Sequence, residues 1–186
     1  ILLKEGRVIM FDETEKVVAQ YLNKNNQSST VSLRNRRDKT GKDEVWFTDI
    51  QITNPQQKKA IWSADGIRFA MKYESFFKEK IRDVRVVITV VNDDMRPVLR
   101  LDSDVTADSF TGDLYPNGEI VCETKATNLV EGRYFANIDF LIKGSSRDHV
   151  LMASEFFVET DLKEYGYRIR VDGTICNNLL QYRFTQ

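Results

Sequence analysis

The chain has 186 residues, of which 27 are Lys or Arg and 28 are Asp or Glu, and 41% of its residues are hydrophobic. This composition is typical of a folded protein and excludes a chain that is disordered throughout. A formal net charge of −1 provides no global positive field, so we expect no nucleic acid as the main partner.

The apolar segments are too short for a membrane helix. The longest run, VVITVV at 86–91, is far below the ~20 residues that a membrane span needs. Charges interrupt the opening ILLKEGRVIM, which excludes a signal peptide there. We therefore expect a cytoplasmic chain. Its two cysteines, Cys122 and Cys176, are predicted to be reduced core thiols, with a single disulfide as the alternative.

The first 42 residues show helical periodicity and then a polar stretch. Residues 2–12 predict a short two-stranded piece around Gly6, and 13–23 predict a helix with one apolar stripe. The polar segment 24–42 reads as a linker. Because the chain opens at Ile1 in mid-pattern, we expect a fragment with a domain end at 1–23, the linker at 24–42 and a second domain at 43–186.

The second domain alternates apolar and polar residues with a period of two, which is the signature of β-strands. Seven segments qualify, rich in β-branched and aromatic residues and separated by turn residues: 44–54, 65–74, 83–92, 97–105, 119–128, 133–143 and 149–159. Seven strands without intervening helices predict an all-β fold. We expect an antiparallel immunoglobulin-like or jelly-roll β-sandwich with a short N-terminal helix and a C-terminal strand extension.

The same alternation assigns residues to faces, because successive side chains of a strand point to opposite sides of the sheet. We expect 44–54, 65–74 and 119–128 in one sheet and 83–92, 133–143 and 149–159 in the other. The predicted core comprises Ile50, Ile52, Ile67, Phe69, Met71, Tyr73, Val84, Val86, Ile88, Val90, Ile120, Cys122, Tyr134, Ala136, Ile138, Phe140, Ile142, Phe156 and Val158. Trp46 shares its parity with Ile50 and Ile52 and is predicted to be core.

The outward face of the second sheet carries more apolar than polar side chains, Ala153 among them. Such a patch is typical of an interface or a ligand groove. Coverage by the tail 160–186 is the alternative explanation, and both hold if the tail comes from a second chain.

Catalytic patterns are weak. His149, the one histidine, is predicted to be solvated at a strand start, and no phosphate-binding GxxxxGK[ST] motif occurs. Asp102 and Asp104 could hold a metal or serve, with Glu155, as the acids of a glycan-processing enzyme, but a strand end explains them as well. We expect a binding protein with no catalytic residues and no metal.

Several segments resemble known proteins. KEGRVIMFDETEKVVAQYLN resembles the closing segment of an ABC-transporter nucleotide-binding domain. VWFTDIQITN, FAMKYE, VVITVVND, PNGEIVCETKATNLVEGRYFANIDFLI and ASEFFVETDLKEYG resemble the C-terminal carbohydrate-binding domain of Wzt-type ATPases, which energise O-antigen polysaccharide exporters. The chain departs from that family at RPVLRLDSDVTAD and at its extreme C-terminus.

The resemblance implies a β-sandwich that binds the modified non-reducing end of a lipid-linked polysaccharide before export. It also implies a location at the cytoplasmic side of the inner membrane, a homodimer with exchanged C-terminal strands, and a transmembrane exporter subunit as partner. The ATPase motifs and the ATP cofactor would belong to an upstream domain, so we expect no cofactor and no ATP hydrolysis in this chain.

Sugar binding requires planar polar groups beside an apolar platform. On the outward face of the second sheet, Arg85, Thr89, Asn137, Asp139 and Glu155 are the predicted polar set and Phe135 is the predicted platform. For an anionic end group, Arg85 and Arg100 are the predicted cations. Solvated surface residues are the alternative for each. The alternative for the whole domain is an immunoglobulin-like protein-interaction module without sugar binding.

The tail at 167–184 is too apolar to leave in water, although seven strands already complete a sandwich. We expect it to add to a sheet edge across two chains in a homodimer, with folding back onto its own sandwich as the alternative.

Overall fold

The computed structural model describes residues 2–4, 7–11, 33–36, 40–41, 44–63, 65–105, 113–127, 129–159 and 182–185. The chain divides into two compact units, Ile1–Ser32 and Leu33–Gln186. In the first, β1 (Leu2–Lys4) and β2 (Arg7–Met10) form an antiparallel pair, which confirms the predicted two-stranded piece. The predicted helix at 13–23 lies outside the described residues, as does most of the predicted linker.

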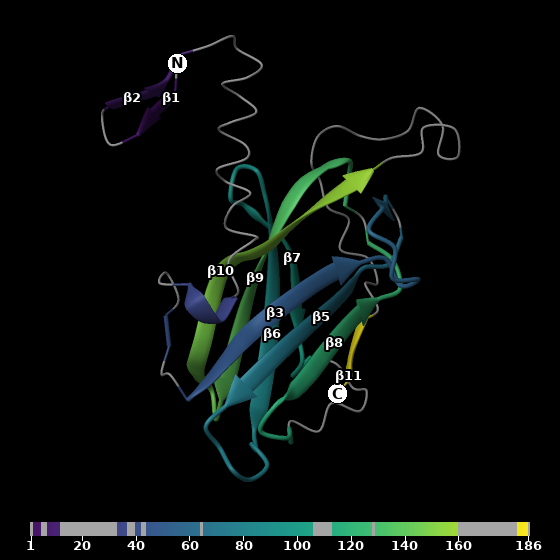
Figure 1. Ribbon diagram of the computed structural model, residues 1–186. Coiled ribbons are helices and arrows are strands. Elements are labelled where there is room, and N and C mark those ends of the chain that lie inside the picture. Colours follow the sequence, from purple (N-terminus) through teal and green to yellow (C-terminus); the bar gives the residue numbers. More distant parts are fainter. Residues whose placement is uncertain are drawn as a thin grey trace. The chain divides into compact units, whose positions relative to one another are not determined.

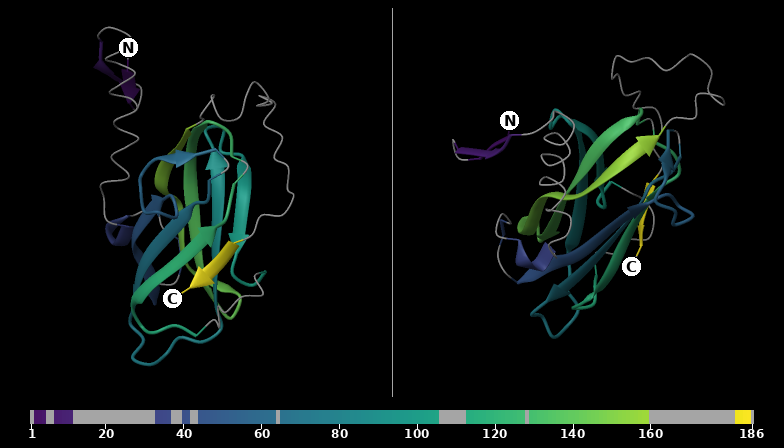
Figure 2. Two further views of the ribbon diagram at one scale, coloured as in Figure 1. Left: turned by 90° about the vertical axis from the view of Figure 1, so that its right-hand side faces the viewer. Right: turned by 45° about the horizontal axis from the view of Figure 1, so that its top comes forward.

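The second unit is a sandwich of two sheets (Figures 1 and 2). The first sheet has the order β4-β10-β9-β6-β7 and the second has the order β11-β8-β5-β3. Their bounds are β3 Val45–Thr53, β4 Ile61–Trp62, β5 Arg68–Ser75, β6 Val84–Asn92, β7 Pro97–Asp102, β8 Gly118–Thr124, β9 Gly132–Ile142, β10 Ser145–Glu159 and β11 Tyr182–Thr185. All pairs are antiparallel except β4 with β10.

The predicted all-β sandwich and its division into two sheets are confirmed. Each of the seven predicted strands corresponds to an observed one. β4, which is only Ile61–Trp62, is an additional strand. β11 is the predicted C-terminal strand extension, and it pairs with β8 at the edge of the second sheet. The described residues contain no α-helix. They include one short 3-10 helix, η2 (Leu33–Asn35), and no helix long and apolar enough to cross a membrane.

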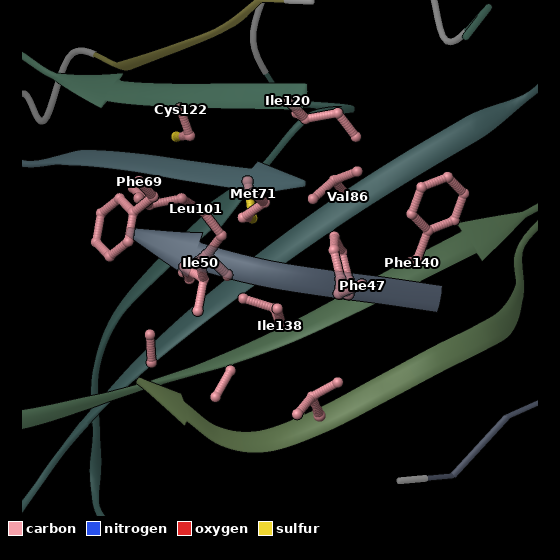
Figure 3. Packing of buried hydrophobic residues seen from close by; sticks show 14 of the residues in the cluster. Phe47, Ile50, Phe69, Met71, Val86, Leu101, Ile120, Cys122, Ile138 and Phe140 are labelled. Atoms are coloured by element: carbon pink, nitrogen blue, oxygen red, sulfur yellow. The ribbon is translucent and has the colours of Figure 1, made fainter. Parts of the chain in front are cut away.

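The core lies between the two sheets. Phe47 and Ile50 of β3 point toward Ile138 and Phe140 of β9 (Figure 3). Every residue of the predicted core except Trp46 is found there, Ile52 as a partly buried neighbour of the cluster. The core also takes in Leu33, which lies inside the predicted linker and is 4% exposed.

Trp46 is not a core residue, contrary to the prediction. The pairing of β3 with β5 shifts between Phe47 and Asp49, which is a β-bulge. Because a bulge adds one residue, the inward parity changes from Val45 and Phe47 before it to Ile50 after it. Trp46 therefore lies on the outer face, where its ring contacts Phe76 at 4.8 Å between centroids.

A second irregularity divides β10 between Val150 and Ser154. Ala153, predicted on the outward face, is 3% exposed and belongs to the core. Met152 within this bulge has a φ of 48°, which is unusual for a residue other than glycine. His149 lies within β10 and not at a strand start as predicted, because β10 begins at Ser145.

Cys122 is a buried free thiol in the core, and burial raises its pKa. This agrees with the prediction for Cys122. Cys176 lies outside the described residues.

Candidate functional site

The outward face of the five-stranded sheet collects the predicted site residues. Strand register places Arg100 of β7, Thr89 of β6 and Asn137 of β9 side by side in one row across three strands. The neighbouring row contains Asp102, Val87, Asp139 and His149 in the same order of strands. Directly opposed side chains in a sheet lie ~5 Å apart, so these two rows bring polar groups of four strands together.

Arg85 is held by a carboxylate of the protein itself. Its Nε and Nη2 donate to the two oxygens of Asp102, at 2.8 Å and 2.5 Å, and Asp104 Oδ2 lies 3.4 Å from Nε. The hydrogen bond from Arg85 holds the pKa of the Asp102 carboxyl below its usual value, and the same bond raises the pKa of Arg85. Most of the hydrogen-bonding capacity of Arg85 toward a ligand is therefore already used by Asp102, and the charge of Asp102 is balanced by Arg85.

Arg100 is the more available cation of the predicted pair. Its Nη2 lies 3.5 Å from Asp102 Oδ2, but 60% of its side chain is exposed, against 34% for Arg85. The structure thus brings Arg85 and Arg100 together, as predicted, around Asp102. An anionic ligand on this face would meet Arg100 first.

Asn137 and Asp139 of β9 face the bulged part of β10. The Oδ1 of Asn137 accepts a hydrogen bond from the Met152 N–H at 2.7 Å, and Oδ1 of Asp139 accepts one from the Ser146 hydroxyl at 2.6 Å. His149 Nδ1 lies 3.7 Å from Asp139 Oδ2 and, within the described chain, has no hydrogen-bond partner. Asn137 therefore supports the bulge, whereas Asp139 keeps oxygen lone pairs for a ligand hydroxyl.

Phe135 does not form an open platform. Its side chain is 5% exposed although it has outward parity, and the Arg133 guanidinium lies over its ring at 5.2 Å from the centroid. Glu155 lies opposite Phe135 in the register. An exposed aromatic ring of this face is instead Phe157 of β10, at 56% exposure. Phe157 has the same parity as Glu155, so the sequence already indicated that its ring lies on this face. The prediction nevertheless chose Phe135 as the platform.

The face suits hydrogen bonding to a polar, hydroxyl-rich ligand. Arg100 donates, Asp139 accepts, Thr89 does both, and Phe157 and Leu151 offer exposed apolar surface. Asp102, which was considered as a metal ligand although no metal was expected, already accepts two hydrogen bonds from Arg85. No group of three His, Cys, Asp or Glu side chains within the described ranges is placed to hold a metal ion.

Comparisons with known proteins identify the fold. No model of a known protein family matches the sequence, and no curated protein matches it. Among solved structures, the crystal structure of the C-terminal domain of Wzt is similar at a TM-score of 0.56 and 13% sequence identity, over 68% of this chain and 81% of that one. A β-glucuronidase from Parabacteroides merdae matches at a TM-score of 0.36 and 16% identity, over 63% of this chain and 13% of that one.

Proposed function

We propose that the sandwich is a carbohydrate-binding module of a polysaccharide exporter, and that it recognises the modified non-reducing end of a lipid-linked O-antigen. The observation that carries the proposal is the pair of polar rows on a sandwich whose fold is like that of the C-terminal domain of Wzt.

The chemistry of the face supports a saccharide ligand. A sugar presents neighbouring hydroxyl groups that pair with carboxylate, amide and guanidinium groups, together with apolar C–H surface that packs on an aromatic ring. Asp139 and Arg100 lie in adjacent rows and supply an acceptor and a donor. Phe157 supplies an exposed ring on the same sheet.

The proposal is tested by measuring how tightly the chain binds two polymers. One is the native polysaccharide, and the other is the same polysaccharide after enzymatic removal of its end group. Asp139→Ala should weaken binding to the native polymer about tenfold, because a ligand hydrogen bond to a charged group is lost. Lys72→Ala, an exposed position on the other sheet, is the control and should bind normally. Asn137→Ala is a poorer probe because it also removes the acceptor of the Met152 N–H.

If Asp139→Ala binds the native polysaccharide as tightly as wild type and has a native circular dichroism spectrum, the binding site does not lie on this face. Equal binding to native and de-capped polymer would contradict recognition of the end group. Binding to neither polymer would favour the protein-interaction module, for which exposed Leu151 and Phe157 would provide the contact surface.

The salt dependence of binding reports the charge of the end group. If that group is a phosphate or an acidic sugar, affinity should fall between low and high salt, because exposed ion pairs are screened. Arg100→Ala should then remove most of the salt dependence, whereas Arg96→Ala, also exposed, should retain it. An affinity that does not change with salt would indicate a neutral end group.

In the proposed assembly the chain is part of a dimeric ATPase at the cytoplasmic side of the inner membrane, beside a transmembrane exporter subunit. ATP would bind an upstream domain, and the sandwich would act by binding alone.

A further inference from the structure

A hollow of about 560 Å³ lies at one end of the sandwich, away from the rows described above. It forms where the connection between β5 and β6 meets the turn between β9 and β10. Buried Ile81 and Ile142 contribute to its lining, together with Phe77, whose side chain is 40% exposed. We call it the basal hollow.

The lining of the basal hollow is positively charged. Four basic residues and two acidic residues line it, an excess of two positive charges in a chain whose net charge is −1. The two acidic residues are Glu44 and Glu79. This local excess favours an anionic occupant.

Two of the basic groups are already engaged. Arg147 Nη1 donates to Glu44 Oε2 at 2.8 Å, and its Nε is buried without a hydrogen-bond partner in the described chain. The Lys80 ammonium lies 4.9 Å from the centroid of the Tyr115 ring. Arg147 still has unused donors, because one of its five N–H groups bonds to Glu44.

The other two basic groups, Arg82 and Lys143, are exposed and make no side-chain ion pair or hydrogen bond with any described residue. The backbone of Lys143 is held in a turn. Its φ is 51° and that of Gly144 is 73°, the combination of a tight hairpin turn, and its N–H donates to the Asp83 carbonyl at 3.0 Å. Asn is the common residue at that turn position, so a lysine there adds a charge that the turn does not need.

The hollow thus combines cations with apolar surface. Arg82, Lys143 and Arg147 can hold an oxyanion, for which guanidinium groups are suited by their planar pairs of donors. Phe77 offers a partly exposed ring to an apolar face, and Ile81 and Ile142 add apolar lining. A bare anion would leave this surface in water, whereas an anion carried on a sugar ring would cover it.

We infer that the basal hollow binds an anionic sugar, with its phosphate or carboxylate at Arg82, Lys143 and Arg147 and its ring against Phe77. The hollow shares no residue with the site residues of the outward sheet face. The inference is therefore independent of the proposed function, and either can fail without the other.

Calorimetric titration of the chain with four probes tests the inference: glucose 1-phosphate, glucuronic acid, glucose and inorganic phosphate. We expect one or both anionic sugars to bind more tightly than glucose and than inorganic phosphate. The better of the two anionic sugars identifies the group. If inorganic phosphate binds as tightly as both anionic sugars, the proposed contact of the sugar ring with Phe77 is wrong. If neither anionic sugar binds, the proposed site is wrong.

Variants locate the binding. Arg82→Ala and Lys143→Asn should each weaken binding of the anionic sugar about tenfold, the lower end of the range for hydrogen bonds to charged groups. Asparagine is chosen at position 143 because it tolerates a positive φ. Lys78→Ala, an exposed lysine of the same connection that does not line the hollow, is the matched control.

Phe77→Ala should weaken the anionic sugar and leave binding of inorganic phosphate unchanged. Lys72→Ala, an exposed position on the other sheet that belongs to neither site, should change the affinity for neither the anionic sugar nor inorganic phosphate. Full affinity in both Arg82→Ala and Lys143→Asn would overturn the assignment.

Discussion

Phe184→Ala should lower the free energy of unfolding by about 3 to 5 kcal/mol, the usual cost of removing a fully buried phenylalanine. Phe184 of β11 is 0% exposed and belongs to the core cluster. Its strand pairs with β8 from Tyr182 to Thr185, opposite Thr124 to Val121. The expected loss therefore combines a cavity with a weakened edge strand. Urea unfolding at neutral pH measures it.

Phe157→Ala is the matched control, because 56% of that side chain is exposed and its removal leaves no cavity. A loss at Phe184 as small as that at Phe157 would contradict the docking of β11 in the core. The exchanged-strand dimer stays a prediction. If the strand comes from a second chain, the wild-type unfolding midpoint should rise with chain concentration, whereas a strand supplied by its own chain gives a constant midpoint.

The sheets and the core could be predicted from the sequence because period-two alternation continues through long strands. In β5, β6 and β9 the inward positions keep the same parity over the whole strand, and every core residue predicted on them is in the core cluster. Their backbone pairing is regular with respect to one neighbour or more, so parity on one strand is maintained across the sheet.

Alternation fails where a bulge changes parity, and the sequence carries no local mark of it. In β3 the bulge is stabilised from a distant strand: the Phe47 N–H donates at 2.7 Å to Oδ2 of Asp148, which is 4% exposed. Such a contact joins residues 101 positions apart. Trp46 was therefore assigned to the wrong face, and the irregularity of β10 misplaced Ala153 in the same way.

The sequence indicated which sheet face the candidate residues share, but it did not indicate which of their side chains are accessible to a ligand. Parity placed Thr89 and Asn137 on one face, and the register shows that they adjoin each other and Arg100, which was predicted separately as a cation. Parity carries no information on what lies over a side chain, so the burial of Phe135 was missed. The basal hollow was missed for another reason, because it is built from turns that meet only in three dimensions.

Asp102→Asn should lower the free energy of unfolding at neutral pH by about 2 kcal/mol. The carboxylate is 7% exposed and receives two hydrogen bonds from Arg85, and bonds to charged groups contribute ~1.5 to 3 kcal/mol each. We place the loss low in that range because Arg85 is 34% exposed and the asparagine oxygen can still accept one bond.

The same loss should depend on pH, with a sign fixed by the lowered pKa of Asp102. The folded protein holds the carboxylate ionised more strongly than the unfolded chain, where an aspartate titrates near ~3.9. The pair therefore stabilises the fold above that value, and its contribution is lost as the pH falls through the lower pKa of the folded state. The difference between wild type and Asp102→Asn should shrink toward zero under acid conditions. Asp104→Asn, at 59% exposure and 3.4 Å from Arg85, is the control and should cost little at any pH. A difference between wild type and Asp102→Asn that persisted unchanged in acid would show that shape, and not the charge of Asp102, stabilises this part of the sheet.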